Sequence, residues 1–359
     1  KPFIRNLLRM SVYQIKYMDA VPDSAVCNEA VKLAKRHKFA QLSGFVNGVL
    51  RNIARNIDSV QLDTLSIRYS MPQWIVDRFV AAYTEKKAEE IFKAFHNKST
   101  ISIRTNLTRC TPDELRAMLE AEGVTVTAVD ELNYAFVISG FDYLNGLQSF
   151  RDGLFYVQDI SSMLVAQTAA PKKGDYVIDV CAAPGGKSTH IAELLQGSGH
   201  VLARDLTDNK VDMIEENIER HGLNNMSAEV WDATVPDADS AGKADILICD
   251  LPCSGLGVLG RKKDIRYKMT PESVDELAAL QRQILDTVHT YVKPNGVLVY
   301  STCTIDEAEN ENNVRWFIEK YPEFELDKSF AEGTGMKQIL PGEHGSDGFF
   351  IARFIKSKL

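Results

Sequence analysis

From Gly174 onward, short apolar runs alternate with longer segments of helical periodicity. The apolar runs are YVIDVC, HVLARD, AEVWD, ADILICD, GVLVYST and FFIARF, and the helical segments begin after Lys187 and at Asn209, Pro271 and Asp306. Strands that alternate with helices at this spacing form a parallel sheet. Each helix returns the chain to the end of the sheet where the previous strand began, so the next strand runs in the same direction. The alternation therefore predicts an α/β domain with a doubly wound, mainly parallel sheet and helices on both faces.

The residues before this domain follow two other patterns. Residues 1–62 are predicted to be all helical, with a Pro-Asp-Ser helix start in VPDSAVCNEAVKLAKRHK and an amphipathic helix in SGFVNGVLRNIARN. Residues 63–155 combine the helices QWIVDRFVAAY and KAEEIFKAF with the strands ISIRTN and VTVTAV. Between those strands, TPDELRAMLEAEG has proline at the first position of a helix and glycine at its end. We therefore expect an all-α domain over 1–62, a small α+β domain over 63–155 and the α/β domain over 156–359.

Charge is distributed unevenly along the chain. The net charge is -8 overall, yet residues 1–57 carry ten lysines and arginines against three acids. A basic segment attached to an acidic body is typical of a module that binds a polyanion, and a solvated helix surface is the alternative. No stretch approaches the roughly 18 apolar residues of a membrane helix. No signal peptide precedes the first helical pattern, and the start at Lys1 within that pattern indicates that earlier residues are missing.

Six cysteines are scattered along the chain without a CxxC pair. Neither a disulfide framework nor a zinc site fits this spacing. We therefore expect free thiols, no bound metal and a reducing cytoplasmic location.

The first strand of the α/β domain runs into DVCAAPGGKSTHIAEL, in which two glycines precede a helix. A phosphate-binding P-loop is excluded because Cys181 stands where that motif needs its first glycine, and the dinucleotide fingerprint G-x-G-x-x-G is absent. The remaining ligand class is S-adenosylmethionine, whose sulfonium and ribose need close backbone and acids rather than a phosphate cradle.

Acids end the next three strands of this domain. Asp205 is expected to accept hydrogen bonds from the ribose hydroxyls, Asp232 from the adenine amino group, and Asp250 lies toward the methionine end. Singly, each acid could instead form a turn or a helix cap. Three of them on successive strands beside a Gly-Gly loop indicate a cofactor site.

Two cysteines follow neighbouring strands. Cys303 precedes Thr304-Ile305-Asp306-Glu307, which has capping-box spacing, so a helix N-terminus is expected to favour its thiolate. Cys253 follows the preceding strand, and both thiols are predicted to face one cleft over the cofactor. The alternative, a small side chain packed in the core, is kept for Cys27, Cys110 and Cys249.

Methylation of carbon 5 of cytosine would use both thiols. That carbon is a poor nucleophile until a thiolate adds to carbon 6 and creates an enamine. A protonated Asp250 near N3 would stabilise the adduct. The second thiol would then assist loss of the carbon-5 proton and expulsion of the nucleophile.

The motifs DLPCSGLG, STCTID and CAAPGGKST resemble the Pro-Cys, Thr-Cys and cofactor-loop motifs of Nop2/Sun-type RNA cytosine-5 methyltransferases. The resemblance implies a class I, Rossmann-like methyltransferase domain in which Cys303 attacks and Cys253 releases the product. It implies cofactor contacts at Cys181, Ala182, Ala183, Pro184, Gly185, Gly186, Lys187, Asp205, Lys210, Asp232 and Asp250. Leu251 departs from the alanine that the family commonly has there.

The first 62 residues resemble the later helices of a NusB-type RNA-binding domain that lacks its start. This combination of domains resembles the bacterial Sun/Fmu group of 16S rRNA methyltransferases, which implies a monomeric enzyme acting on a cytosine in a 16S rRNA hairpin loop near the P site. Two alternatives stay open: a relative acting on tRNA or another rRNA cytosine, and a non-catalytic RNA-binding or antitermination factor. The basic run RKKDIRYK is expected to contact RNA phosphates through Arg261, Lys262 and Lys263, or else to be a solvated surface.

Overall fold

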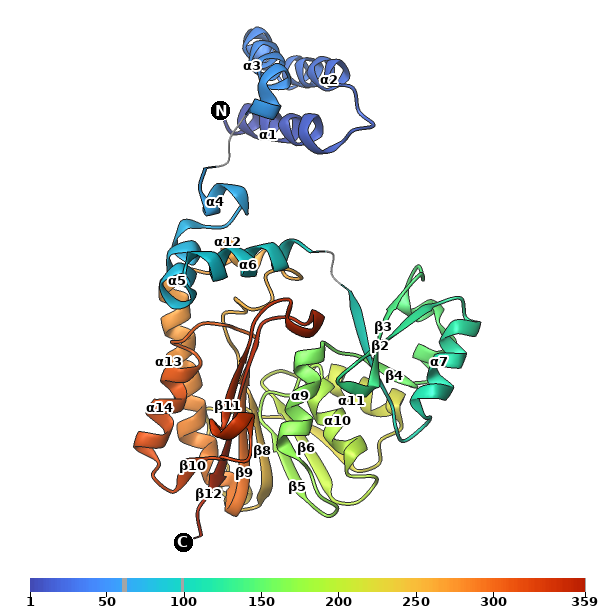
Figure 1. Ribbon diagram of the computed structural model, residues 1–359, viewed down its shortest axis with the longest axis vertical. Coiled ribbons are helices and arrows are strands. Elements are labelled where there is room, and N and C mark those ends of the chain that lie inside the picture. The colour runs from blue at the N-terminus through green and yellow to red at the C-terminus, as the bar shows by residue number, and fades with distance from the viewer. Residues whose placement is uncertain (60–62, 98–99, 359) are drawn as a thin grey trace. The chain divides into compact units, whose positions relative to one another are not determined.

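The computed structural model describes residues 1–59, 63–97 and 100–358. The chain forms two compact units, Lys1–Arg68 and Tyr69–Leu359 (Figure 1). In the part of the chain that is described, no helix is both long and apolar enough to cross a membrane.

The first unit is helical, as its sequence predicts. Its elements are α1 (Pro2–Tyr17), α2 (Asp23–Arg36), η1 (Ala40–Leu42), α3 (Ser43–Asn56), η2 (Ile57–Ser59) and α4 (Leu65–Arg68). The apolar stripes of α1, α2 and α3 meet in a small core around Leu7, Ala30, Val46 and Leu50. Most lysines and arginines of this unit are exposed, because they lie on the opposite faces of these helices.

The second unit begins with α5 (Gln73–Tyr83) and α6 (Glu85–His96), which confirm the two helices expected there. A four-stranded antiparallel sheet follows, in the order β2-β3-β1-β4. The strands of this sheet and the helices that connect them are, in chain order, β1 (Ile101–Thr105), α7 (Pro112–Ala121), β2 (Thr125–Val129), β3 (Leu132–Ser139), η3 (Leu144–Gly146), α8 (Gln148–Arg151) and β4 (Phe155–Val157). Thr111 and Glu114 form a capping box that fixes the start of α7.

A larger sheet of mainly parallel strands confirms the predicted α/β fold. Its order is β10-β12-β9-β8-β5-β6-β7, with β11 paired to β12. The strands are β5 (Tyr176–Asp179), β6 (His200–Asp205), β7 (Met226–Val230), β8 (Ala244–Asp250), β9 (Val292–Thr302), β10 (Phe324–Leu326), β11 (Met336–Ile339) and β12 (Phe349–Lys356). Strands β5 to β9 pair in parallel, whereas β12 runs antiparallel to β9, β10 and β11.

Helices cover both faces of this sheet (Figure 1). Figure 1 shows α9 (Ile160–Ala169), α10 (Gly186–Leu194) and α11 (Asp208–His221) on one side, and α13 (Pro271–Val288) and α14 (Glu311–Lys320) on the other. Neighbouring strand residues point to opposite faces, so Leu298 joins the α13–α14 core and Val299 joins the α9–α11 core. The short elements are η4 (Ala238–Ser240), α12 (Ile265–Lys268), η5 (His289–Tyr291), η6 (Ala331–Gly333) and η7 (Glu343–Gly345).

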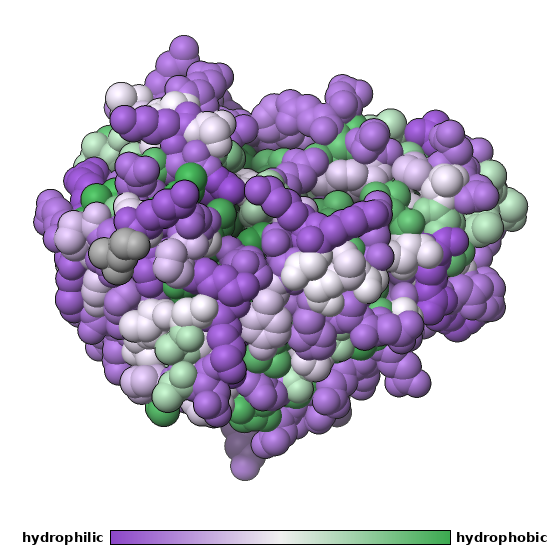
Figure 2. All heavy atoms as spheres, turned by 90° about the horizontal axis from the view of Figure 1, so that it is seen from below, coloured by the Kyte–Doolittle hydropathy of each residue, from purple (hydrophilic) through white to green (hydrophobic). Residues whose placement is uncertain are grey.

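The face of the molecule seen in Figure 2 is mostly polar, with apolar side chains scattered over it. Scattered apolar side chains are ordinary on a protein surface that contacts water. The cavity described next is the stronger functional signal.

Candidate active site

A cavity of about 400 Å³ opens where β5, β8 and β9 end. The carboxyl ends of parallel strands are where open α/β sheets bind ligands. Many of the predicted site residues line it, namely Cys181, Ala182, Ala183, Pro184, Gly186, Lys187, Asp250, Lys262 and Cys303. Its lining also includes residues that the sequence did not single out, among them Tyr156, Gln158, Asp159, Asp179, Asp347 and Phe349.

The loop from β5 to α10 forms one wall of this cavity. Gly185 adopts a φ of +101°, which favours glycine, and α10 begins at Gly186. A Cβ atom on Gly186 would lie 3.1 Å from Cε1 of Tyr156, so a side chain there would press against β4. The hydroxyl of Tyr156 donates to the carbonyl of Pro184 at 3.2 Å. The loop is therefore held between the two sheets with its backbone close to the cavity.

Asp205 supports this loop from the end of β6. It is 4% exposed, and its carboxylate accepts the Ala183 N–H at 2.9 Å and the Lys210 ammonium at 2.8 Å. The Leu206 N–H also donates to this carboxylate at 2.7 Å. A carboxylate offers about four lone-pair sites, so these three donors leave capacity for about one ligand hydroxyl. Asp205 lies beside the cavity lining and contacts it through Ala183. Lys210 is paired with Asp205 and is not itself part of the lining.

Asp232 lies farther from the cavity than expected. β7 ends at Val230, and the N–H of the next residue, Trp231, donates to the Asp205 carbonyl at 2.9 Å. Asp232 is exposed and accepts the N–H and the hydroxyl of Thr234 at 2.8 and 2.7 Å. The expectation that Asp232 ends a strand is therefore wrong, and it occupies the following turn.

A buried carboxyl at the end of β5 was missed. Asp179 is 1% exposed, and burial raises its pKa to about 7 although Ser188 donates a hydrogen bond to it. It ends a strand as Asp205 and Asp250 do, and this shared position was the available signal. Gln158 gave no such signal: it is buried in the cavity wall, and its Nε2 has no hydrogen-bond partner among the described residues.

The two cysteines that follow β8 and β9 lie in contact. The Sγ atoms of Cys253 and Cys303 are 3.3 Å apart. β8 and β9 are parallel neighbours with Asp250 beside Ser301 in register, so the segments that follow them leave the same edge side by side. Cys303 lines the cavity, whereas Cys253 contacts it from behind the lining, so the expectation that both thiols face one cleft stays a prediction.

The surroundings of the two sulfur atoms differ. The hydrogen bond from Cys253 lowers the pKa of Cys303 despite burial, and Lys187 and Lys262 act in the same direction. The same hydrogen bond, burial and the neighbouring charges of Cys303 and Glu309 raise the pKa of Cys253. The lowered pKa of Cys303 favours it as the thiolate of the pair, with Cys253 as the donor between the two sulfur atoms, while the charge of Asp250 opposes this.

The expected helix N-terminus at Thr304 is wrong. α14 begins at Glu311, and residues 307–310 form turns. Asp306 forms a salt bridge with Arg78 and accepts the Ala308 N–H, so its carboxylate serves a turn instead of a helix cap. The thiolate of Cys303 is thus favoured by Cys253 and two lysines, without a helix dipole.

Asp250 and Lys187 form an ion pair in the cavity. The Lys187 ammonium lies 2.7 Å from Asp250 Oδ2, and the Ser301 hydroxyl donates to Oδ1 at 2.8 Å. Burial alone would lower the pKa of Lys187, but the charge and hydrogen bond of Asp250 outweigh burial and raise it. The pair therefore places a charged donor and a carboxylate near the Cys303 thiolate.

The predicted RNA-contacting run is divided between several environments. Arg261 forms ion pairs with Asp159 at 2.9 Å and Asp347 at 2.6 Å, and burial together with Asp159 raises the pKa of Asp347 to about 6. Lys262 lines the cavity, and Lys263 is exposed. Later in the run, Arg266 is buried and donates to backbone carbonyls, so RKKDIRYK is no single solvated surface.

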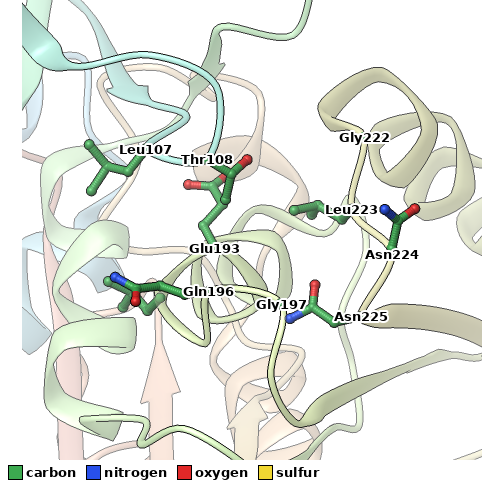
Figure 3. A pocket seen from close by; sticks show the side chains of 10 residues that line it. Leu107, Thr108, Glu193, Gln196, Gly197, Gly222, Leu223, Asn224 and Asn225 are labelled. Carbon is green, nitrogen blue, oxygen red and sulfur yellow. The ribbon is translucent and has the colours of Figure 1, made fainter.

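A second cavity, of about 440 Å³, contains none of the predicted site residues. Figure 3 shows its walls, which come from the segment after β1, the end of α10 and the turn between α11 and β7. Across residues 1–59, 63–97 and 100–358, no group of three or more His, Cys, Asp or Glu side chains could hold a metal ion.

Comparison with known proteins gives three family matches. Residues 166–355 match the family described as 16S rRNA methyltransferase RsmB/F, residues 1–55 match the NusB family, and residues 71–141 match the ferredoxin-like domain of RsmF/B-like methyltransferases.

Individual relatives extend these matches over nearly the whole chain. A probable ribosomal RNA small subunit methyltransferase B of Bacillus subtilis is 38% identical, over 99% of this chain and 83% of its own length. The solved structure of PH0851 has a TM-score of 0.81 at 28% identity, covering 100% of this chain and 83% of that one. NSun6 from Pyrococcus horikoshii, solved with SFG, has a TM-score of 0.72 at 24% identity, covering 80% and 99%.

Proposed function

The chain belongs to the 16S rRNA methyltransferase RsmB/F family, whose members are S-adenosylmethionine-dependent rRNA methyltransferases, and from this premise we propose that it methylates carbon 5 of a cytosine. The observation that carries this proposal is the pair of thiols 3.3 Å apart, with a lowered pKa on Cys303 and a raised pKa on Cys253. A thiolate beside a thiol supplies a nucleophile and a second group for its release. Methylation of carbon 5 needs both.

In the proposed attack, the Cys303 sulfur adds to carbon 6 of the cytosine. The π electron pair of the C5–C6 bond moves to the C4–C5 bond, and that of C4–N3 moves to N3. N3 takes a proton from Asp250, and Asp250 receives that proton from the Lys187 ammonium. Carbon 5 is then nucleophilic and can form its new bond to a methyl group. When bound, S-adenosylmethionine supplies that methyl group as an electrophile on sulfur. N3 returns its proton to Lys187 through Asp250 once carbon 5 is methylated.

Release requires a base for the carbon-5 proton, and we assign this role to Cys253. The proton that Cys253 holds in the resting pair leaves to solvent, and the proton from carbon 5 replaces it. Cys303 departs with the electron pair of its bond to carbon 6, which restores the C5–C6 double bond. One proton is released overall, and the thiol and thiolate are back in their starting states.

The proposed cofactor contacts fit the chemistry of the cavity wall. The bare backbone at Gly185 and Gly186 allows close approach, and the unpartnered Nε2 of Gln158 is a donor without an acceptor among the described residues. Asp205 would accept from the ribose. The loop residues from Cys181 to Lys187 would line the cofactor, with Lys210 and Asp232 on the outer side.

We further propose that Arg261, Lys262 and Lys263 contact RNA phosphates and that the target is a cytosine in a 16S rRNA hairpin loop near the P site. The enzyme would act as a cytoplasmic monomer. The exposed lysines and arginines of the first unit support RNA binding, because phosphate contacts dominate such affinity. To contact a phosphate, Arg261 would have to break its ion pairs with Asp159 and Asp347.

Bisulfite sequencing of 16S rRNA tests this function. Cells that lack the gene should lose one 5-methylcytosine, and the wild-type gene should restore it while Cys303→Ala should not. Loss of a methylated cytosine in tRNA or at another rRNA site would favour the first alternative. Unchanged methylation of every cytosine in the gene's absence would favour a non-catalytic RNA-binding factor.

A further inference from the structure

A buried carboxylate lies behind the two thiols. Glu309, in the turn between β9 and α14, is 0% exposed. Its Oε1 accepts the Ser254 N–H at 2.9 Å and the Gln281 Nε2 at 2.9 Å, and its Oε2 accepts the Ser254 hydroxyl. All three hydrogen bonds are accepted by Glu309, so the carboxylate form satisfies each of these donors.

These contacts hold both neighbours of Cys253. Ser254 is bound to Glu309, and Gln281 Nε2 also donates to the Pro252 carbonyl at 2.8 Å. Gln281 is fixed in turn, because its Oε1 accepts from Tyr300 at 3.1 Å and from Asn313 at 2.7 Å. The backbone on either side of the Cys253 thiol is therefore anchored to one buried polar network.

The same network reaches the Cys303 segment. The hydroxyls of Ser254 and Thr304 are 2.9 Å apart, and the Gly257 N–H donates to the Cys303 carbonyl at 3.1 Å. A Cβ atom on Gly257 would lie 2.2 Å from the Gly348 carbonyl oxygen and 2.8 Å from that of Cys303. The two cysteine segments are thus closely packed at Gly257, which limits how far they can move apart.

Different charged groups also act on the two thiols. The carboxylate of Glu309, whose own pKa is raised by burial, raises the pKa of Cys253. The charges near Cys303 are mixed, because Asp250 raises the pKa of Cys303 while Lys187 and Lys262 lower it. The negative charge of Glu309 therefore favours the proton on Cys253, and the two ammonium groups counteract Asp250 beside Cys303.

We propose that Glu309 is a positioning residue that holds Cys253 against Cys303 and keeps the shared proton of the pair on Cys253. The inference rests on the proposed function, because it concerns the release step of that reaction. Attack needs the Cys303 thiolate, which Lys187 and Lys262 favour as well as Cys253. Release in the proposed scheme has no base other than Cys253, which must stand at the correct place. Loss of Glu309 should therefore slow release more than attack.

Two variants and one control separate this role from general support of the fold. Glu309→Gln keeps the size but replaces one acceptor oxygen by a donor, which leaves Ser254 or Gln281 without its acceptor. Ser254→Ala removes the hydroxyl contacts to Glu309 and Thr304, but Oε1 of Glu309 keeps its hydrogen bonds from the residue-254 N–H and from Gln281, so it is the milder variant. Glu307→Gln lies in the same turn, where its side chain is 55% exposed and pairs with Arg315, and it serves as the control.

Two RNA substrates separate attack from release. RNA carrying 5-fluorocytidine traps every enzyme that attacks, because fluorine on carbon 5 cannot leave as a cation. On this RNA, with S-adenosylmethionine present, both variants should form the denaturation-resistant adduct within about twofold of wild type. On ordinary RNA, Glu309→Gln should accumulate adduct and turn over at least about tenfold more slowly, since a buried hydrogen-bonded charge is lost. Ser254→Ala should lie between wild type and Glu309→Gln, and Glu307→Gln should match wild type.

The inference is overturned if both variants turn over ordinary RNA at the rate of Glu307→Gln without accumulating adduct. It is also overturned if they lose trapping on 5-fluorocytidine RNA and cofactor affinity together, since that pattern indicates general support of the fold. If wild type itself fails to trap 5-fluorocytidine RNA, the covalent scheme of the proposed function is wrong and the inference falls with it. If Glu309→Gln does not fold, the Ser254→Ala result decides.

Discussion

Cys303 and Cys253 touch each other, yet their alanine variants should differ in kind. Cys303→Ala removes the thiolate, so carbon 5 is never activated and no methyl group is transferred. Cys253→Ala leaves the attacking sulfur in place but removes the base for release. It should therefore accumulate a protein–RNA adduct on denaturing gels when S-adenosylmethionine is present, and the double variant should show none. Trapping by Cys303→Ala in place of Cys253→Ala would exchange the two roles.

The lowered pKa of Cys303 has a measurable pH dependence. Iodoacetamide reacts with thiolate, so the alkylation rate of Cys303 should rise with a midpoint below the 9.0 of an ordinary cysteine thiol. Lys262→Gln removes a positive charge that lowers this pKa, so the midpoint should move upward. The adjacent Lys263→Gln, whose side chain does not line the cavity, is the control. Equal midpoints for Lys262→Gln and wild type would remove Lys262 from the surroundings of the thiolate.

Asp205 should contribute strongly to cofactor affinity if it accepts from the ribose. Asp205→Ala removes a buried charged acceptor, worth about 1.5–3 kcal/mol, so the Kd for S-adenosylmethionine measured by calorimetry should rise roughly 10- to 100-fold. Asp212→Ala, an exposed position on α11, should leave the Kd unchanged. An Asp205→Ala variant with wild-type affinity would exclude Asp205 from the cofactor site.

Among single residues, the sequence predicted those that can be recognised from their neighbours along the chain. The Gly-Gly loop and the two cysteines were found because turn chemistry directly follows a strand. Tyr156, Gln158 and Asp347 were missed, because they reach the cavity from segments outside those motifs, and pairing between distant segments leaves no local pattern.

Between elements, β1 of the small sheet is joined to α10 by one fully buried arginine. Arg104, 0% exposed, donates to the Gly186 carbonyl at 2.7 Å and to Glu193 at 2.7 Å. Arg104→Met leaves Glu193 buried without its ion partner, which should lower the free energy of unfolding by about 3–5 kcal/mol in urea denaturation. It should also weaken cofactor binding, because Gly186 loses a donor that holds the cofactor loop.

The double variant Arg104→Met/Glu193→Leu is the matched control for this ion pair. Removing both charges leaves no unpaired carboxylate, so much of the lost stability should return. If Arg104→Met lowers the free energy of unfolding by less than about 1 kcal/mol, the Arg104–Glu193 pair does not contribute to folding as described.

Elements with strong periodicity were predictable, and α7 and β8 agree with their patterns. The start of α14 was not, because Thr304 and Glu307 have the spacing of a capping box while Asp306 is drawn into an ion pair with Arg78, far away in sequence. Sequence spacing cannot report a partner of that kind.

For the whole molecule, basic groups in two distant parts of the chain should act together on RNA. Lys35→Ala/Arg36→Ala on α2 and Lys262→Ala/Lys263→Ala beside the cavity should each flatten the dependence of log K on log salt, by about 0.7–0.9 for every RNA phosphate that the variant no longer neutralises. Combined, the two sets should add. Lys172→Ala/Lys173→Ala, exposed residues just before β5, should leave the slope unchanged. A slope that stays at the wild-type value in both sets would place RNA elsewhere.

The family matches confirm the family that the motifs and their order indicated. Residues 1–55 match the NusB family, which fits the basic first unit, and residues 166–355 match the methyltransferase family. The ferredoxin-like match over residues 71–141 was not predicted by name, because a small antiparallel sheet has few residues that distinguish its family.

The place of β12 in the larger sheet bears on how the enzyme is made. Phe350 on β12 pairs with Thr302 on β9, and Asp347 and Phe349 close the cavity beside Cys303. Protein synthesis proceeds from the N-terminus, so β9 leaves the ribosome with its flank bare until β12 emerges. The nascent chain therefore carries both thiols before it carries their complete surroundings. An enzyme that modifies ribosomal RNA thus completes its site only after β12 has been translated.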